Sequence, residues 1–395
     1  MILSPRDGIR SSLICLALIA IAEILPLAAQ PKRPLPPGVA AHRNLEYIPH
    51  GHERHRLDVY IPEVSTQPLP LIIWVHGGGW QNGGKEGCPP LRKGYVQRGY
   101  VVASLNYRLS GHAVFPAQIE DCKAAVRWLR ANAARFGIDP KRVGVWGSSA
   151  GGHLAALLGT SGDVKEFDVG GNLDQSSRVQ AVCDYYGPTD FKVFVTTPRY
   201  ESHASRNSPE AKLIGGAVLE NREKARRANP IEYVTGDDPP FLIVHGDEDR
   251  TVPLNQSRLL FEALARAGCD VRFHTIHGAG HGRPGFDSAE IEGMVGRFFD
   301  QKLRLRTVDP PLAAATASSV SEAERKAMER GGANRRRGRV TFDQVLSRHD
   351  RDEDGRLSRK EFPGGTALFD RMDRDTDGFV TRVEHERTFG PDSPR

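Results

Sequence analysis

The feature that most constrains the fold is a serine between two glycines, at the junction of an apolar run and a helical segment. The run Val143–Trp146 leads directly into Gly147–Gly152, which reads Gly-Ser-Ser-Ala-Gly-Gly. A strand that turns into a helix over so few residues leaves room only for small residues two positions before and after the apex of the turn. Gly147 and Gly151 meet this requirement around Ser149. We therefore expect Ser149 to present an exposed hydroxyl at a strand-to-helix turn.

Short β-branched runs alternate with amphipathic stretches between residues 31 and 305. This alternation is typical of a parallel sheet whose strands are connected by crossover helices. Residues 119–136 carry apolar side chains at helical spacing. The runs expected to form buried strands are Leu71–Val75, Tyr100–Ser104, Val143–Trp146, Val179–Tyr185 and Phe241–Val244. The sequence thus predicts an α/β fold for residues 31–305.

Length and composition exclude several other classes of protein. The chain has 395 residues, 39% hydrophobic and 26% charged, with a net charge of +5. Such a length allows two or three domains. The composition argues against a fully disordered chain and against a polytopic membrane protein. A charge of +5 with both signs interspersed is too small to indicate a nucleic-acid partner.

The N-terminal residues resemble an export signal. Arg6 and Arg10 precede an apolar run over residues 13–27, and small residues follow it. This order describes a secretory signal peptide over residues 1–30, and the apolar run is too short for a spanning helix. We expect cleavage near Ala29 and Gln30, with the mature protein periplasmic or extracellular.

Four cysteines remain after the expected cleavage: Cys88, Cys122, Cys183 and Cys269. Disulfides are permitted outside the cytoplasm, and four cysteines allow three pairings, among which the sequence does not choose. Small buried residues in a large core are the alternative.

A second glycine-rich segment follows the strand expected at Leu71–Val75. His76–Trp80 reads His-Gly-Gly-Gly-Trp, which is an oxyanion-loop pattern, because glycines let backbone amides approach a carbonyl oxygen. The same stretch nearly forms a phosphate-binding loop ending at Lys85, but Glu86 occupies the position of the magnesium-binding hydroxyl. Trp80 is expected either as a wall facing the substrate or as a core residue.

Two acids and one histidine complete a catalytic triad in chain order. The strand ending at Val244 runs into Asp247 and Asp249, and His281 lies in a later glycine-flanked loop. The order serine, acid, histidine is that of the α/β hydrolases and differs from both classical protease orders. We expect Asp249 to be the acid, because it lies beyond the strand end, and Asp247 to cap a turn. His274 and His277 are expected to be ordinary strand-end residues, and His50, His52 and His55 to be surface residues.

With these motifs, residues 45–303 resemble the α/β hydrolase superfamily. The resemblance is narrower to an esterase branch that includes bacterial feruloyl and acetyl xylan esterases of the BD-FAE type and the hormone-sensitive-lipase-like carboxylesterases. It rests on His76–Trp80, Asn106–Leu109, Phe115–Gln118, Asp121, Ala125–Leu129, Gly147–Gly152, His245–Asp249, Val252, Pro253 and Gly280–Gly282.

The resemblance implies a role for each matching residue. Ser149 would be the nucleophile, His281 the base and Asp249 the group that orients it. The backbone amides of Gly78, Gly79 and Ala150 would bind the oxyanion. It further implies a small-molecule or polysaccharide ester as substrate and no cofactor for catalysis.

The C-terminal residues carry a second, independent signature. Residues 306–338 are rich in Ala, Ser, Pro and Arg and indicate a linker, and residues 339–395 contain two twelve-residue calcium-loop patterns. The expected ligands are Asp350, Asp352, Asp354, Arg356 and Glu361 in the first loop and Asp373, Asp375, Asp377, Phe379 and Glu384 in the second, with Arg356 and Phe379 acting through backbone carbonyls. The tail resembles a bacterial EF-hand pair that binds two Ca²⁺ ions in a structural or docking role. A cell-envelope component or another protein is the docking partner that this role would imply.

Two other function classes remain open. A peptidase of the prolyl-oligopeptidase kind uses the same order of triad residues, and a calcium-dependent adhesion or scaffold protein could retain a non-catalytic hydrolase fold. The acyl and alcohol groups of a substrate depend on residues 188–240, which we expect to form a small cap.

Overall fold

The computed structural model describes residues 34–304 and, in the tail, residues 357–359, 362, 368, 369, 372, 373 and 379–381. The expected signal peptide and linker lie outside these residues. The chain divides into two compact units, Met1–Thr307 and Val308–Arg395.

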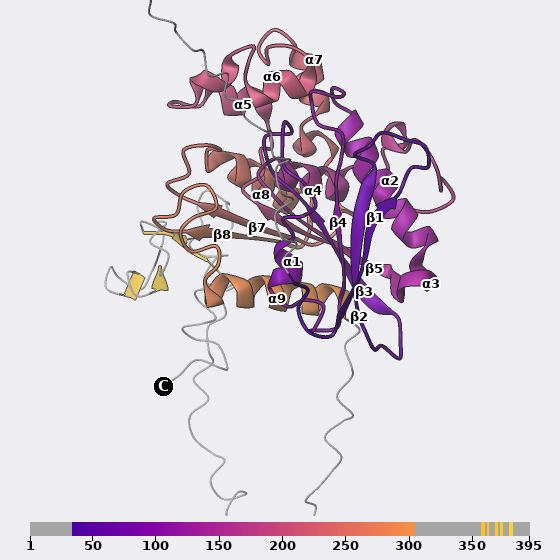
Figure 1. Ribbon diagram of the computed structural model, residues 1–395. Coiled ribbons are helices and arrows are strands. Elements are labelled where there is room, and N and C mark those ends of the chain that lie inside the picture. Colours follow the sequence, from indigo (N-terminus) through magenta and orange to yellow (C-terminus); the bar gives the residue numbers. More distant parts are fainter. Residues whose placement is uncertain are drawn as a thin grey trace, which may run out of the picture. The chain divides into compact units, whose positions relative to one another are not determined.

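The first unit is built on one eight-stranded sheet in the order β1-β2-β4-β3-β5-β6-β7-β8 (Figure 1). Its strands are β1 (Val39–Glu46), β2 (Arg56–Pro62), β3 (Leu69–Val75), β4 (Val101–Leu105), β5 (Ile138–Ser148), β6 (Ala181–Tyr185), β7 (Phe241–Gly246) and β8 (Val271–Ile276). The strand β2 runs antiparallel to both neighbours, and every pairing from β4 to β8 is parallel. The expectation of a mostly parallel sheet flanked by helices is confirmed.

All five apolar runs expected as strands lie largely or wholly within strands of the sheet. Neither β1 nor β2 was among these expected runs, and for β1 the burial pattern explains why. Only Val39 of its eight residues is buried, because β1 lies at the edge of the sheet. An edge strand of this kind contains no apolar run that a sequence pattern could reveal.

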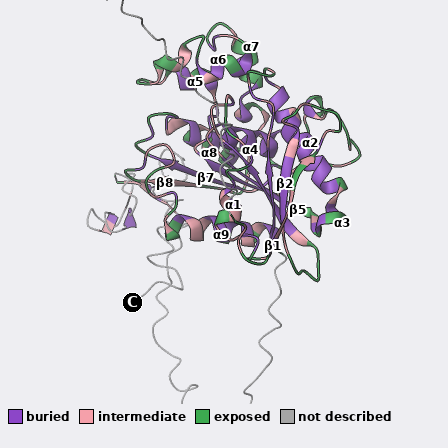
Figure 2. Ribbon diagram, viewed as in Figure 1, coloured by how far each residue is buried: buried purple, intermediate pink, exposed green. Residues whose placement is uncertain are grey.

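Helices cover both faces of the sheet. They are α1 (Pro89–Arg92), α2 (Ala117–Ala131), α3 (Ala133–Phe136), α4 (Ala150–Thr160), α5 (Phe191–Thr196), α6 (Pro209–Ile214), α7 (Arg222–Arg227), α8 (Asn255–Arg266) and α9 (Ala289–Leu303). Buried side chains of α2, α4 and α8 share one hydrophobic cluster with the sheet, and those of α9 belong to a second cluster. Figure 2 shows the strands between these helices as mostly buried. Among the described residues, no helix combines the length and apolarity needed to cross a membrane.

Residues 188–240 form a group of short helices. They contain α5, α6 and α7 and two short 3₁₀ turns, Glu201–Ala204 and Pro230–Tyr233. Figure 1 shows α5, α6 and α7 grouped together at the top of the view, away from α1 and α9.

The helix expected over residues 119–136 is present with a break near its end, where α2 gives way to α3 after Ala131. Besides its apolar face, α2 buries Lys123, Arg127 and Arg130. These side chains donate hydrogen bonds to backbone carbonyls between residues 140 and 178, among them Lys123 Nζ to the carbonyl of Ser161 at 2.8 Å. A buried cation needs such partners, so α2 anchors the long connection that follows α4.

In the part of the chain that the structure describes, all four cysteines are free thiols. Cys88, Cys122 and Cys183 are buried, and Cys269 is partly exposed. None of the three possible disulfide pairings is present, and the alternative of small buried core residues describes Cys88, Cys122 and Cys183.

Lys85, the residue that nearly completed a phosphate-loop pattern, is buried in an ion pair. Its Nζ lies 2.9 Å from Asp58 Oδ1, and both side chains are about 5% exposed. Asp58 also accepts hydrogen bonds from the Asn44 amide and the Tyr60 hydroxyl. Because the carboxylate already neutralises Lys85, this lysine is not available to a phosphate.

We expect Lys85→Met to lower the free energy of unfolding by about 3–5 kcal/mol, because the substitution leaves Asp58 buried and unpaired. Adding Asp58→Asn should recover a large part of that loss. Urea unfolding of the full chain measures both effects. Arg206→Met is the matched control, because the Arg206–Glu220 pair is exposed and should contribute at most about 1 kcal/mol. A Lys85→Met loss no larger than that of the control would contradict this account of the pair.

Candidate active site

The turn around Ser149 is as tight as the sequence requires. β5 ends at Ser148 and α4 begins at Ala150, which leaves Ser149 with φ 55° and ψ −124°. A Cβ on Gly147 would lie 2.0 Å from the carbonyl oxygen of Gly151, and one on Gly151 would lie 2.1 Å from that of Val75. No side chain fits at these distances, so Gly147 is required for β5 to pass directly into α4, and Gly151 is required for α4 to pack against the end of β3.

The three residues of the expected triad form one hydrogen-bonded chain. His281 Nε2 lies 3.0 Å from Ser149 Oγ, and His281 Nδ1 lies 2.7 Å from Asp249 Oδ2. Ser149 follows β5, Asp249 follows β7 and His281 follows β8. The structure thus brings together three residues that are up to 132 positions apart.

Asp247, the competing acid, lies elsewhere in the same loop. Its side chain accepts a hydrogen bond from the Gly278 amide at 2.7 Å and contacts His277 Nδ1 at 2.8 Å. It therefore caps the turn after β8, as the sequence led us to expect, and it has no contact with His281.

The Asp249 carboxylate is buried and surrounded by donors. Its Oδ1 accepts the amides of Thr251 at 2.7 Å and Val252 at 2.9 Å. Burial alone would raise the pKa of the Asp249 carboxyl, but hydrogen bonds from His245 and His281 hold that pKa well below its usual range. Asp249 is therefore ionised at neutral pH and accepts the Nδ1 proton of His281.

The ionised Asp249 carboxylate determines which nitrogen of His281 carries the proton. With its Nδ1 proton directed to Asp249, His281 presents the Nε2 lone pair to the Ser149 hydroxyl. The ring of Tyr186 packs 4.6 Å from the His281 ring and limits its rotation. The arrangement is suited to removing a proton from Ser149.

The glycine loop after β3 leaves several backbone amides without a protein acceptor. Gly78 and Gly79 have φ values of 113° and 57°, which favour glycine. Within the described residues, the amides of Gly78, Gly79 and Ala150 donate to no protein group. These three amides are the expected oxyanion donors, and each is available to a ligand oxygen.

His76 supports this loop through both ring nitrogens. Its Nδ1 lies 2.7 Å from the Gly77 carbonyl, and its Nε2 lies 3.1 Å from Arg54 Nη2. A carbonyl requires a donor and an arginine requires an acceptor, so His76 is neutral with its proton on Nδ1. Its ring also stacks on Tyr107 at 4.4 Å.

Trp80 occupies the second of its two expected positions. Its side chain is 1% exposed and packs edge-on against His153 and Phe191. This is the placement of a core residue, and it does not support the interpretation of Trp80 as a substrate-facing wall.

His55 also differs from its expected surface position. It is buried, and its Nε2 lies 3.0 Å from Asp121 Oδ1, a carboxylate that Arg108 also contacts. The sequence pattern could not reveal this pair, because the two residues lie 66 positions apart.

One cluster outside the triad has side chains that could ligate a metal. His52, Glu53 and His112 have ligand atoms within 4.8 Å of one another. However, the Nδ1 atoms of both histidines accept backbone amides, from Arg54 and Leu109. The ring proton of each neutral histidine then lies on Nε2, where a metal would bind, so this geometry disfavours a metal site.

Most of the expected calcium ligands lie outside the described residues: Asp350, Asp352, Asp354, Arg356, Glu361, Asp375, Asp377 and Glu384. Asp373 is buried, and Phe379 belongs to a short strand, β10 (Phe379–Val380), that pairs antiparallel with β9 (Leu357–Ser358). In this pairing Val380 lies opposite Leu357. Leu357 and Val380 are each the eighth residue of their twelve-residue loop pattern. The short strand pairing therefore connects the two patterns at the same position of each.

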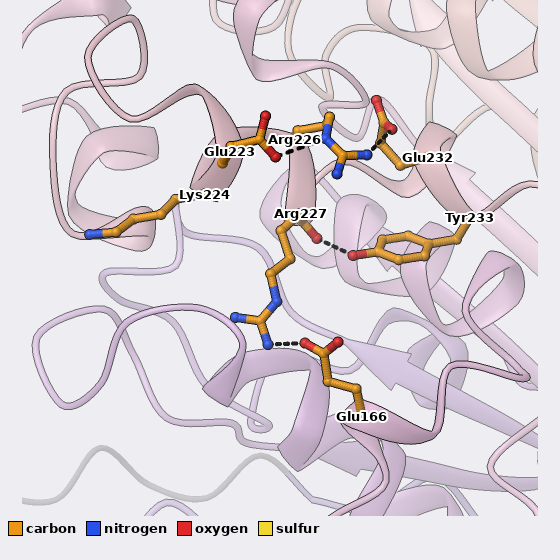
Figure 3. Close-up of a pocket in the computed structure, with 7 residues that line it drawn as sticks. All are labelled: Glu166, Glu223, Lys224, Arg226, Arg227, Glu232 and Tyr233. Atoms are coloured by element: carbon orange, nitrogen blue, oxygen red, sulfur yellow. Dashed lines mark hydrogen bonds and ion pairs between the residues drawn. The ribbon is translucent and has the colours of Figure 1, made fainter.

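A hollow of about 400 Å³ lies on the surface between α7 and the 3₁₀ turns Lys165–Phe167 and Pro230–Tyr233 (Figure 3). No triad residue lines it. Its arginines are paired within its own wall, Arg227 with Glu166 and Arg226 with Glu223 and Glu232. The charges of these two arginines are therefore already balanced by carboxylates of the wall.

Two further side chains contact the acid turn and were given no role in the sequence analysis. The hydroxyl of Tyr200 donates to the backbone carbonyl of Asp249. His245 lies 3.3 Å from Asp249 Oδ2. The position of His245 four residues before the acid was a usable signal, whereas nothing in the sequence around Tyr200 indicates its contact.

Two buried histidines should make stability depend on pH. Burial lowers the pKa of His76 and that of His153 to about 4 each. An unfolded histidine has a pKa of about 6.5, so between pH 6.5 and 4 the unfolded chain binds protons that the folded chain does not. We expect the free energy of unfolding to fall over this interval as the pH is lowered, by about 3 kcal/mol for each ring.

His153→Gln provides the test of that dependence. The ring donates from Nε2 to the Ala228 carbonyl at 2.7 Å, and a glutamine amide can make the same hydrogen bond without titrating. Urea unfolding at several pH values should show that the free energy of unfolding falls less steeply with decreasing pH in this variant than in the wild type. An unchanged pH dependence would show that His153 does not contribute to it.

This chain is similar in sequence to a known family and to named esterases. The BD-FAE family model matches residues 57–264. The esterase LipC of Mycobacterium tuberculosis is 33% identical over 267 residues, which cover 64% of this chain and 64% of LipC. The esterase LipQ of the same organism is 34% identical over 228 residues, 57% of this chain and 53% of LipQ. The chain thus spans less than two thirds of the length of these relatives.

Solved structures show the same fold. A truncated carbohydrate esterase from gut microbiota is 33% identical, with a TM-score of 0.61 over 67% of this chain and 96% of that chain. An acetyl ester-xyloside bifunctional hydrolase from Caldicellulosiruptor lactoaceticus is 27% identical, with a TM-score of 0.51 over 68% and 94% of the two chains. The family model covers more than half of the residues, and helices flank a mostly parallel eight-stranded sheet. The chain therefore belongs to the BD-FAE family, with an α/β hydrolase fold.

Proposed function

We propose that this protein is a serine hydrolase that cleaves carboxylic esters through an acyl-enzyme. The observation that carries the proposal is the hydrogen-bonded chain from Ser149 Oγ through His281 to Asp249, at 3.0 and 2.7 Å. It is supported by the family and by the named esterases among its relatives.

In the first half of the reaction, His281 Nε2 removes the proton from Ser149 Oγ as that oxygen attacks the ester carbonyl carbon. Asp249 stabilises the imidazolium that forms, without itself taking the proton. His281 then donates the proton to the departing alcohol, which leaves the acyl group on Ser149. In the second half, His281 activates water, which hydrolyses the acyl-enzyme and regenerates the Ser149 hydroxyl.

The negative oxygen of each tetrahedral intermediate requires donors fixed in advance. The amides of Gly78, Gly79 and Ala150 are assigned this role. Such donors stabilise the charge that develops in the transition state, and one of them typically contributes about 10²–10³-fold to kcat.

For the substrate, we propose acetyl or feruloyl esters of carbohydrates, or small esters of similar acids. This class is supported by the carbohydrate esterase from gut microbiota and the acetyl ester-xyloside hydrolase among the similar structures. The signal-like residues 1–30 support export to the periplasm or the cell exterior.

We also propose that the tail binds two Ca²⁺ ions. Both loop patterns supply carboxylates at positions 1, 3 and 5 and a glutamate at position 12, as calcium loops do. The pairing of Leu357 with Val380, and the small core of Leu357, Phe369, Met372 and Val380, are consistent with two linked loops. The weak calcium affinity of extracellular modules supports a structural or docking role for the tail, toward the cell envelope or another protein.

The triad residues provide the test of ester hydrolysis. With p-nitrophenyl acetate we expect Ser149→Ala to lower kcat by about 10⁶-fold and Asp249→Asn by about 10⁴-fold, because the wrong histidine tautomer remains in the second variant. Ser148→Ala, the neighbouring serine, is the control and should stay within a few-fold of wild type. Full turnover by Ser149→Ala would refute the mechanism.

Parallel assays on acetylated xylan, methyl ferulate and a proline-containing peptide separate the substrate classes. Faster cleavage of the peptide than of both esters would favour the prolyl-oligopeptidase alternative. A folded protein that hydrolyses none of the three substrates but still binds calcium would favour the scaffold alternative.

For the tail, calorimetric titration should show calcium binding at about 10⁻⁴–10⁻³ M, and it should be lost in the double variant Glu361→Gln/Glu384→Gln. Chelation by EDTA should reduce the helical signal of the tail while esterase turnover stays within about twofold. Absence of binding in the wild type would refute the calcium sites. A large, calcium-reversible loss of turnover would instead show that the tail regulates the hydrolase unit.

A further inference from the structure

A second histidine lies against the acid of the triad. His245, in β7, is fully buried, and its Nε2 lies 3.0 Å from the carbonyl oxygen of Val252 and 3.3 Å from Asp249 Oδ2. On the other side of the ring, Nδ1 lies 2.7 Å from Ser257 Oγ in α8. The ring therefore bridges the acid turn and α8.

The partners of His245 fix where its proton lies. Nε2 faces a carbonyl and a carboxylate, both of which only accept, so Nε2 must carry the proton. Ser257, which is also fully buried, can donate its hydroxyl proton to Nδ1. The neutral Nε2–H tautomer satisfies every polar atom in this group, whereas the Nδ1–H tautomer would place a lone pair against a buried carboxylate.

We propose that His245 is a positioning residue for the hydrolytic reaction: its Nε2–H, shared between the Val252 carbonyl at 3.0 Å and Asp249 Oδ2 at 3.3 Å, holds the Asp249 carboxylate in the orientation that His281 needs. The inference rests on the proposed function, since it concerns the acid of that triad. With two amides on Oδ1 and two histidines on Oδ2, the carboxylate has no free rotation, and Oδ2 points to His281 Nδ1. The contact to Val252 also fixes the turn that supplies one of those amides.

Two substitutions of His245, by glutamine and by asparagine, distinguish this positioning role from simple packing. Glutamine places its amide nitrogen where Nε2 lies, and asparagine places its amide nitrogen where Nδ1 lies, so the two variants have the same chemistry and differ in the hydrogen bond that they keep. We expect His245→Gln to retain kcat within about threefold. We expect His245→Asn to lower kcat by about 10–100-fold at unchanged KM, which is the effect of losing a hydrogen bond to a charged group.

His274→Gln is the matched control. His274 lies beside Val244 on the neighbouring strand β8 and is half-buried, and this variant should keep wild-type kcat. Thermal unfolding of each variant shows whether it is folded under the assay conditions. Equal kcat values for the glutamine and asparagine variants, whether high or low, would overturn the proposal, because the position of the donor would then have no effect.

A second measurement does not depend on turnover. NMR of the wild-type protein with ¹⁵N-labelled histidine, with the His245 signal assigned by its loss in His245→Gln or by sequential experiments, reports which ring nitrogen carries the proton. The Nε2–H tautomer is expected, and the Nδ1–H tautomer would overturn the proposal. This readout also separates the two ideas: wild-type protein that shows the Nε2–H tautomer but no ester hydrolysis would contradict the proposed function and leave the positioning contact intact.

Discussion

The active site is built on a turn in which the backbones of β5 and α4 approach so closely that no side chain fits between them. A Cβ at Gly147 would meet the backbone of Gly151 at 2.0 Å, so the chain can make this turn only with glycine at that position. The turn holds Ser149 in the left-handed region, at φ 55°, which places its hydroxyl beyond the edge of the sheet. Because parallel strands end at the same edge, the loops after β7 and β8 reach that hydroxyl with an acid and a histidine. The geometry of the triad is thus a consequence of strand order.

Around this turn, each buried polar group has hydrogen-bond partners that allow only one protonation state. Asp249 accepts hydrogen bonds from two amides and from His281, lies 3.3 Å from His245 Nε2, and remains ionised. In the loop next to Ser149, the Gly77 carbonyl and Arg54 together keep His76 neutral, and His76 supports the glycine loop. The acid side and the oxyanion side are therefore built in the same way, with a histidine whose tautomer is set by its two neighbours. Such pairing is what makes buried polar groups tolerable in a core.

The sequence predicted the parts of this structure that depend on local pattern. The buried strands appear as apolar runs, and the strand-to-helix turn appears as glycine spacing around Ser149. The order of serine, acid and histidine along the chain led to Asp249 and His281. Contacts between distant residues could not be predicted in this way: His55 pairs with Asp121 across 66 positions, and Tyr200 reaches the Asp249 carbonyl across 49. Trp80 remained ambiguous because an aromatic residue after a glycine loop can face either the substrate or the core, and only its packing against Phe191 decides between them. The edge strand β1 lacked an apolar run because it is only partly buried.

If Ser149 is a nucleophile activated by His281, a fluorophosphonate should label it covalently in the full-length protein. Peptide mass spectrometry should then find a single phosphonylated residue, Ser149, and labelling should slow by orders of magnitude in His281→Ala. Labelling of another serine, or labelling of Ser149 at the same rate without His281, would contradict this mechanism.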